Sequence, residues 1–324
     1  MAIPELPGGP NRSARSSGVK QSADTALSRP DQVEHVLRRL ELTITRRLDG
    51  LLHGSYLGLL PAAGTEPGES REYHPGDDVR RMDWPVTART QVPYVRQTEA
   101  DRELETWIIY DGSNSLAFGT GYYEKKELAM AGLAAIVFLV AGGGNRIGAM
   151  VSGGTRVQRI PAQSGMASAR ALMRKVMEFR PVPQGQAGVS VGAAIDSLRR
   201  APRKRGMSVV ISDFLGDPTW HEPLRGLGAL QQVLAIEVID PRDLDLPDVG
   251  VLTLVDPETG EELELQTSRR DVREKYEAAA RGQREQIATG VRRARASHLQ
   301  LRTDRDWLID IVRFVGEQKR RRMK

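Results

Sequence analysis

The chain has 324 residues, of which 40% are hydrophobic, and it contains no cysteine. This length suits one large domain or two small ones, and the lack of cysteine excludes disulfides and thiolate zinc sites. The net charge is +5, but residues 316–324 contribute five basic residues and one acidic residue, which leaves about +1 for the rest. A nearly neutral body with a cationic tail argues against a general nucleic-acid-binding protein.

Residues 1–30 are rich in Pro, Gly and Ser and lack the apolar segment of a secretory signal, so we expect a disordered leader. Residues 31–52 repeat apolar side chains at helical spacing and predict one amphipathic helix. From Gly54 to Arg96 the chain is rich in glycine, proline and charge, which predicts a long loop of the kind that usually carries function. We therefore expect a leader (1–30), a helix with a charged loop (31–102) and a larger domain (103–324).

Strand and helix patterns alternate in the larger domain. The apolar runs "TWIIYD", "GMSVVISD" and "VLAIEVID" predict buried strands, and two hairpins are expected at Gly153-Gly154 and at "PETG". The run "LAMAGLAAIVFLVAG" is too short to span a bilayer and predicts a core helix. This alternation predicts a mainly parallel sheet with helices on both faces and one antiparallel hairpin strand.

The end of the chain, about sixty residues, is predicted to be helical. "SRRD" (268–271) and "TDRD" (303–306) are expected to open its two helices as capping boxes. The last helix continues into the basic tail, and its apolar side is expected to dock on the sheet.

Two strands end in aspartates that suggest a site. Asp111 opens the motif D-x-S-x-S with Ser113 and Ser115, and Asp213 ends a second strand. Parallel strands present their carboxyl ends at one edge, and Mg²⁺ prefers such hard oxygen ligands. The alternative is that the serines cap the next helix while Asp111 accepts backbone N–H groups. Both interpretations stand at this point.

"DGSNS" followed by "ISDF" resembles a von Willebrand factor type A domain, whose metal-ion-dependent adhesion site uses D-x-S-x-S, a threonine and a later aspartate. The resemblance implies a von Willebrand factor A-like (Rossmann-like) α/β fold and a site for Mg²⁺, or Mn²⁺ as a substitute, at Asp111, Ser113, Ser115 and Asp213. Val189 stands where the threonine would be. Because valine cannot bind a metal, the neighbouring Ser190 is the candidate replacement, and the site is expected to be degenerate.

The charged loop "REYHPGDDVRRMDWPVTAR" resembles the signature of a bacterial family catalogued as domain of unknown function fifty-eight, and the resemblance extends through the rest of the chain. One interpretation is an ion-pair network that pins the loop, with Trp84 anchored in an apolar pocket. The other is a partner-binding surface. Its candidate residues are Arg71, Tyr73, Asp77, Asp78, Arg80, Asp83, Trp84 and Arg89.

Family resemblance implies a non-enzymatic adaptor or co-chaperone for a MoxR-type AAA+ ATPase, with a membrane-bound von Willebrand factor A protein as a further candidate partner. His74 is a candidate catalytic base, but no serine lies in a G-x-S-x-G motif and no second histidine lies at metal-ligand spacing. We therefore expect His74 to be a surface histidine. The alternatives are a metal-dependent hydrolase and a scaffold whose tail touches anionic lipid weakly. The expected location is the cytoplasm, with the inner face of the membrane as an alternative.

Overall fold

The computed structural model describes residues 70–74, 79, 82–96, 104–201, 206–216 and 218–322. The predicted leader (1–30) and the predicted helix (31–52) lie outside these residues.

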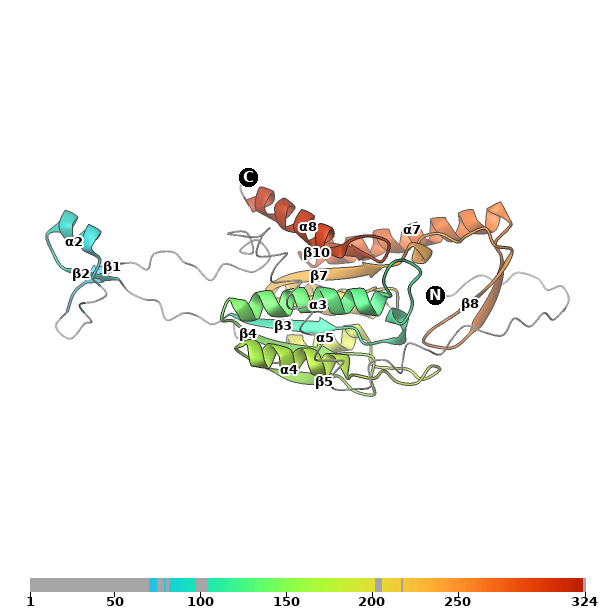
Figure 1. Ribbon diagram of the computed structural model, residues 1–324, viewed down its shortest axis with the longest axis horizontal. Coiled ribbons are helices and arrows are strands. Elements are labelled where there is room, and N and C mark those ends of the chain that lie inside the picture. The colour runs from blue at the N-terminus through green and yellow to red at the C-terminus, as the bar shows by residue number, and fades with distance from the viewer. Residues whose placement is uncertain are drawn as a thin grey trace.

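A six-stranded sheet forms the centre of the larger domain (Figure 1). Its spatial order is β10-β7-β6-β3-β4-β5, and all neighbouring strands are parallel except the β4–β5 pair. The strands are β3 (Glu105–Tyr110), β4 (Arg146–Val151), β5 (Gln158–Gln163), β6 (Gly206–Ser212), β7 (Gln232–Ile239) and β10 (Ser297–Arg302). The predicted antiparallel hairpin strand is therefore β5.

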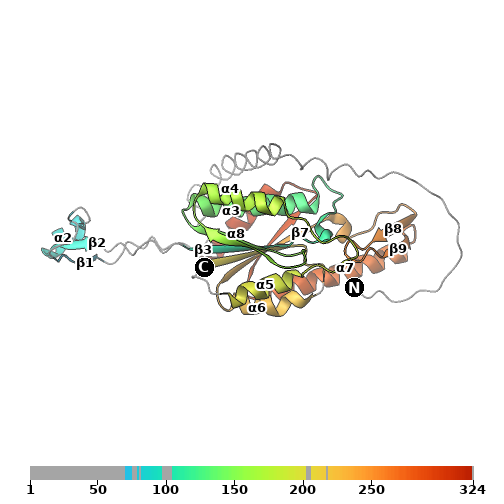
Figure 2. The ribbon, with the colours of Figure 1, turned by 90° about the horizontal axis from the view of Figure 1, so that it is seen from below.

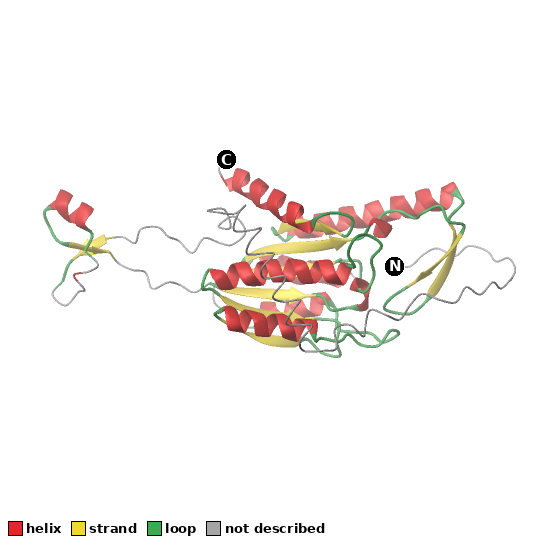
Figure 3. Cartoon of the chain, in the orientation of Figure 1, coloured by secondary structure: helices red, strands yellow, loops and turns green. Residues whose placement is uncertain are grey.

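Helices cover both faces of this sheet, as Figures 2 and 3 show. One face carries α3 (Lys125–Gly142), α4 (Met166–Met177) and α8 (Trp307–Arg322). The other carries α5 (Val191–Arg200), α6 (His221–Gly228) and α7 (Arg270–Arg293). The predicted architecture, an α/β domain with a mainly parallel sheet and helices on both faces, is confirmed.

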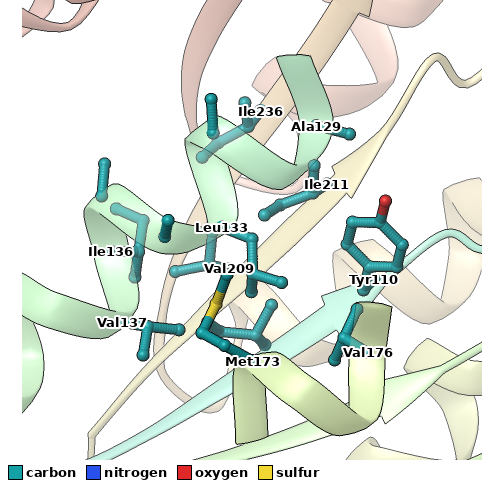
Figure 4. Packing of buried hydrophobic residues seen from close by; sticks show 14 of the residues in the cluster. Tyr110, Ala129, Leu133, Ile136, Val137, Met173, Val176, Val209, Ile211 and Ile236 are labelled. Atoms are coloured by element: carbon teal, nitrogen blue, oxygen red, sulfur yellow. The ribbon is translucent and has the colours of Figure 1, made fainter. Parts of the chain in front are cut away.

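The helix α3 lies at the centre of the larger core. Leu133 and Val137 of α3 gather with Val209 of β6 and Met173 of α4 (Figure 4), and all four side chains are fully buried. The prediction of a core helix is confirmed, since most residues of α3 beyond its charged first turn are apolar and buried. No helix in the described part of the chain has both the length and the apolar character needed to cross a membrane.

The sequence interpretation is wrong at three points near the C-terminus. The strand β10 was missed within a region predicted to be wholly helical. The helix α7 begins at Arg270 without a side-chain cap, so the predicted capping box at 268–271 does not form. In the second predicted box, Thr303 donates to Asp240 at 2.7 Å, and Asp306 instead accepts the Leu308 N–H at 3.0 Å before α8. At 268–271, Asp271 pairs instead with its neighbour Arg269 at 2.7 Å, and at 303–306 the tertiary contact of Thr303 replaces the local box.

The predicted charged loop contains regular structure. The strands β1 (Ser70–Glu72) and β2 (Tyr94–Arg96) pair antiparallel, and a short helix α2 (Trp84–Thr90) lies between them in the sequence. The helix was missed because seven residues are too few to show a helical period.

The second predicted hairpin is confirmed as β8 (Val251–Val255) and β9 (Glu262–Gln266), which form a separate two-stranded sheet. Three single-turn 3-10 helices complete the described elements: η3 (Asn114–Leu116), η4 (Pro218–Trp220) and η5 (Pro241–Asp243).

Candidate functional site

Asp111 and Asp213 lie side by side at the point where the chain order of the sheet reverses. After β3 the chain builds β4 and β5 on one side, and it then returns to build β6 and β7 on the other. Tyr110 of β3 is paired with Ile211 of β6, and the Asp111 N–H donates to the Ile211 carbonyl at 2.9 Å. Ligand sites of open parallel sheets occur at this switch point.

Asp111 is held by hydroxyl and backbone donors. It is only 6% exposed, and its Oδ2 accepts from Ser212 Oγ at 2.6 Å. Its Oδ1 accepts from the Ser113 N–H at 3.1 Å and from Ser152 Oγ at 3.4 Å. Burial, followed by the negative charge of Asp213, raises the pKa of Asp111 despite these hydrogen bonds. Sequence reasoning missed Ser212 and Ser152, which are ordinary serines at strand ends.

The two serines of the D-x-S-x-S motif face each other. Ser113 Oγ and Ser115 Oγ are 2.9 Å apart, and both residues are half-buried. Ser113 makes no side-chain capping bond to η3, while Glu124 and Glu127 cap α3. The capping alternative is therefore wrong for the serines. It is right for Asp111, which accepts a backbone N–H as described above.

Asp213 is paired with a buried lysine. Lys125 Nζ lies 2.9 Å from Asp213 Oδ2 and 3.3 Å from Asp243 Oδ1, and Lys125 is 2% exposed. Burial alone would lower the pKa of Lys125, but the two carboxylates outweigh it and raise that pKa. Sequence reasoning missed Lys125, whose only signal is a charged residue in the first turn of an otherwise apolar helix.

The charged network continues behind Asp243. Arg284 lies 3.4 Å from Asp243 and 2.6 Å from Glu237, which is fully buried in β7. His298 and Gln300 of β10 also contact Glu237, at 2.9 and 2.8 Å. Acidic and basic groups alternate along this interior chain, so the burial of Asp213 belongs to an extended network.

A third strand-end aspartate, Asp240 after β7, fixes the loop before α3. It accepts hydrogen bonds from the Thr120 N–H at 2.7 Å, Thr120 Oγ1 at 2.6 Å and Thr303 Oγ1 at 2.7 Å. Burial would raise the pKa of Asp240, but these donors outweigh it and lower that pKa. Asp240 thus holds three segments of the chain together at the edge that carries Asp111 and Asp213.

Glycines allow the loops of the site to touch through their backbones. Gly153 has φ of 87°, and a Cβ there would lie 2.5 Å from the carbonyl carbon of Gly112. A Cβ at Gly188 would lie 2.8 Å from the Gly153 carbonyl oxygen. Because side chains cannot fit at these contacts, the loops at 112, 153 and 188 meet in van der Waals contact.

Val189 and Ser190, at the position of the family threonine, have structural partners. The Val189 N–H donates to the Gly154 carbonyl at 2.9 Å, and the Val189 carbonyl accepts from the Gly153 N–H at 2.8 Å. Ser190 is exposed, and its Oγ accepts the Ala193 N–H at 3.3 Å as the N-cap of α5. Ser190 therefore caps a helix at the rim of the site.

The tip of the β8–β9 hairpin lies at the same rim. The Gly185 N–H donates to the Glu258 carbonyl at 2.9 Å, and Gln184 Nε2 donates to the Asp256 carbonyl at 3.4 Å. Burial, and then the charges of Asp111 and Asp213, raise the pKa of Glu258. The hairpin thus brings a third carboxylate toward the two strand-end aspartates, which the sequence did not indicate.

The signature segment differs from its predicted arrangement. Trp84 is 66% exposed, so the expected apolar pocket is wrong. Asp83 is buried and caps α2 by accepting the Val86 N–H at 3.3 Å. Tyr73 is half-buried, whereas His74, as predicted, and Arg89 are exposed. Asp77, Asp78, Arg80 and the side chain of Arg71 lie outside the described residues.

The predicted metal residues do not fit Mg²⁺ as they are arranged here. The hydroxyls of Ser113 and Ser115 suit the ion, but Asp213 is committed to Lys125 and Ser190 to its helix cap. Among the described residues, no group of three or more histidines and carboxylates is placed to hold a metal ion. Mg²⁺, or Mn²⁺ in its place, stays a prediction from the resemblance, and the geometry disagrees with it.

The sheet and the polar residues at its switch point define an α/β domain with a mainly parallel sheet and a polar carboxyl edge. The model of the family described as "Protein of unknown function DUF58" matches residues 69–286, and the chain belongs to this family. The uncharacterized protein Rv1480 of Mycobacterium tuberculosis is 52% identical over 286 residues, which cover 88% of this chain and 89% of that protein.

Two solved structures are similar to this chain at low sequence identity. BatB from Bacteroides thetaiotaomicron matches with a TM-score of 0.42 and 17% identity, over 67% of this chain and 99% of that chain. A von Willebrand factor type A protein from Catenulispora acidiphila matches with a TM-score of 0.34 and 13% identity, over 70% of this chain and 43% of that chain.

Proposed function

We propose that this protein is a non-enzymatic binding module, an adaptor or co-chaperone that presents the carboxyl edge of its sheet to another protein. The observation that carries the proposal is the pair of half-buried hydroxyls, Ser113 and Ser115, beside the buried Asp111 at the switch point. Glycine contacts and the hairpin tip hold this edge in shape, and a rigid polar rim suits recognition of a protein surface.

The proposed partner is a MoxR-type AAA+ ATPase, which the family resemblance implies. A membrane-bound von Willebrand factor A protein is the second candidate, and the proposed location is the cytoplasm or the inner face of the membrane. The exposed Trp84 supports a contribution from the signature segment, because exposed tryptophans are enriched among the residues that dominate protein interfaces.

The test is recovery of partners from the native cells with tagged full-length protein. We expect the wild type to retain a MoxR-type ATPase, and Asp111→Ala to lose most of it, because Ser212 and the Ser113 N–H would lose their acceptor. Asp196→Ala is the matched control, since within the part of the chain that the structure describes Asp196 pairs with its helix neighbours Arg199 and Arg200. An ATPase that the Asp111 variant retains as well as the control does would remove the strand edge from the proposal.

Two rival functions give different results. A metal-dependent hydrolase would turn over generic phosphate esters in the presence of Mn²⁺, and Asp111→Ala would abolish that turnover. A scaffold that works through its basic tail would lose liposome association when residues 316–324 are deleted. An adaptor of the proposed kind shows no such turnover and keeps its ATPase after the deletion.

A further inference from the structure

The buried ion pair of Lys125 and Asp213 stands at the position where a von Willebrand factor A site would use its last aspartate. Lys125 is the first residue of α3, and its Nζ reaches Asp213 Oδ2 at 2.9 Å and Asp243 Oδ1 at 3.3 Å. Lys125 is 2% exposed and Asp213 is 1% exposed. A pair so deeply enclosed is a fixed part of the interior.

Both carboxylate oxygens of Asp213 are engaged within the protein. While Oδ2 accepts from Lys125, Oδ1 accepts the Leu215 N–H at 3.2 Å. A divalent cation beside Asp213 would have to displace the ammonium or lie close to it. Displacement leaves the buried lysine without its nearer carboxylate, and proximity places two positive charges together in a medium that screens them poorly.

The other predicted ligands agree with this picture. Asp111 accepts hydrogen bonds from Ser212, Ser113 and Ser152, and Val189 contributes only backbone groups to the neighbouring loop. The carboxylate of Asp213 therefore already has hydrogen-bond partners and a counter-charge at this edge of the sheet.

We infer that the Lys125 ammonium takes the charge-balancing place of a divalent cation at this edge, so that the site forms and works without metal. The inference concerns the isolated chain, and it stands independently of which partner the proposed function assigns. It predicts that loss of the lysine charge creates a cation requirement that the wild type lacks.

The test is a Mg²⁺ titration of the full-length chain. Binding is measured by calorimetry and by thermal unfolding, and NaCl at the same ionic strength serves as the salt control. The wild type is expected to show no saturable Mg²⁺ heat and an unchanged Tm. Lys125→Met should acquire saturable binding and gain about 3 °C in Tm at about 10 mM Mg²⁺, because an ion that binds only the folded state stabilises it. Lys126→Met, one residue away on the half-buried side of the same turn, is the matched control and should respond as the wild type does.

Saturable Mg²⁺ binding by the wild type in the millimolar range would overturn the inference. A folded Lys125→Met protein whose Tm ignores Mg²⁺ would also overturn it. If Lys125→Met is unfolded, recovery of its native circular dichroism on addition of Mg²⁺ supports the inference. Failure to recover, combined with a folded Lys125→Met/Asp213→Asn double variant, would overturn the inference, because the lysine would then balance charge in a place that no cation can take.

Discussion

Asp111 and Asp213 end neighbouring strands, yet the protein accommodates their burial in two different ways. Asp111 is surrounded by neutral donors, chiefly Ser212 Oγ at 2.6 Å and the Ser113 N–H at 3.1 Å. Asp213 has a full counter-charge, Lys125, at 2.9 Å. One half of the site is therefore organised by hydrogen bonds, and the other by an ion pair.

This difference shows which half can change during recognition. Hydroxyl donors such as Ser113 and Ser115 rotate and exchange partners at little cost, whereas a buried ion pair is expensive to break from one side. We therefore expect a partner to engage the Asp111 half, and the Asp213 half to hold the scaffold. Removing one group at a time tests this division.

The largest effect is expected from Lys125→Met without added metal. This substitution leaves Asp213 buried without its counter-charge, and breaking a buried pair from one side costs about 3–5 kcal/mol in the free energy of unfolding. Urea unfolding followed by circular dichroism measures it. The double variant Lys125→Met/Asp213→Asn should recover much of the loss, because the unpaired charge is then absent. A loss below about 1 kcal/mol in the single variant would contradict a structural role for the pair.

A smaller effect is expected from Ser212→Ala in the other half. Ser212 Oγ donates to Asp111 at 2.6 Å and accepts the Phe214 N–H at 2.9 Å, and it is fully buried. Loss of a hydrogen bond to a buried charged group costs about 1.5–3 kcal/mol. Ser152→Ala, which removes a contact of only 3.4 Å, should cost less than half as much in the same urea experiment. Equal losses would mean that Ser212 is not the principal donor to Asp111.

The pH dependence should separate Asp111 from Asp240. The pKa of Asp111 is raised by burial and by Asp213, so Asp111 takes up a proton more readily in the folded state than in the unfolded chain. Its contribution to stability is full below the unfolded pKa of 3.8 and is lost as the pH rises through the folded pKa. Asp111→Asn should therefore gain stability relative to the wild type as the pH rises from 3.8 through the folded pKa of Asp111.

Asp240 has the opposite sign. Its pKa is lowered because the donors of Thr120 and Thr303 outweigh burial, so its contribution is present above 3.8 and is lost as the pH falls through the folded pKa. Asp240→Asn should therefore lose stability relative to the wild type as the pH rises toward 3.8, and the difference should stay constant above that pH. Urea unfolding at several pH values measures both differences, and slopes of the same sign would contradict this assignment.

Much of the fold is predictable from the sequence because the buried strands are continuous apolar runs. The runs "TWIIYD" and "GMSVVISD" predict β3 and β6. The parallel pairing of these strands places Asp111 and Asp213 at the same edge of the sheet. The strand β10 was missed because only Leu299 and Leu301 are fully apolar and buried in it, and such weak alternation next to long helices favours a helical interpretation.

Only the part of the site that is local in the sequence could be predicted. The D-x-S-x-S motif is local in sequence, so Asp111, Ser113 and Ser115 could be found together. Lys125 reaches Asp213 across 88 positions of the sequence, and Glu258 at the hairpin tip lies still further along the chain from Asp111. Contacts of this kind depend on how α3 and the hairpin pack, and no spacing rule in a single sequence encodes them.

The smallest effect on stability is expected from Trp84→Ala, which tests whether the signature segment shares in recognition. Trp84 is 66% exposed, so its loss should change the free energy of unfolding by less than about 0.5 kcal/mol. Trp220→Ala is the structural contrast, because Trp220 is 1% exposed and removing such a side chain costs about 3–5 kcal/mol. If Trp84→Ala keeps its stability and yet retains less of the ATPase, the exposed tryptophan belongs to the binding surface. If Trp84→Ala retains the ATPase as well as the wild type does, recognition is confined to the carboxyl edge of the sheet.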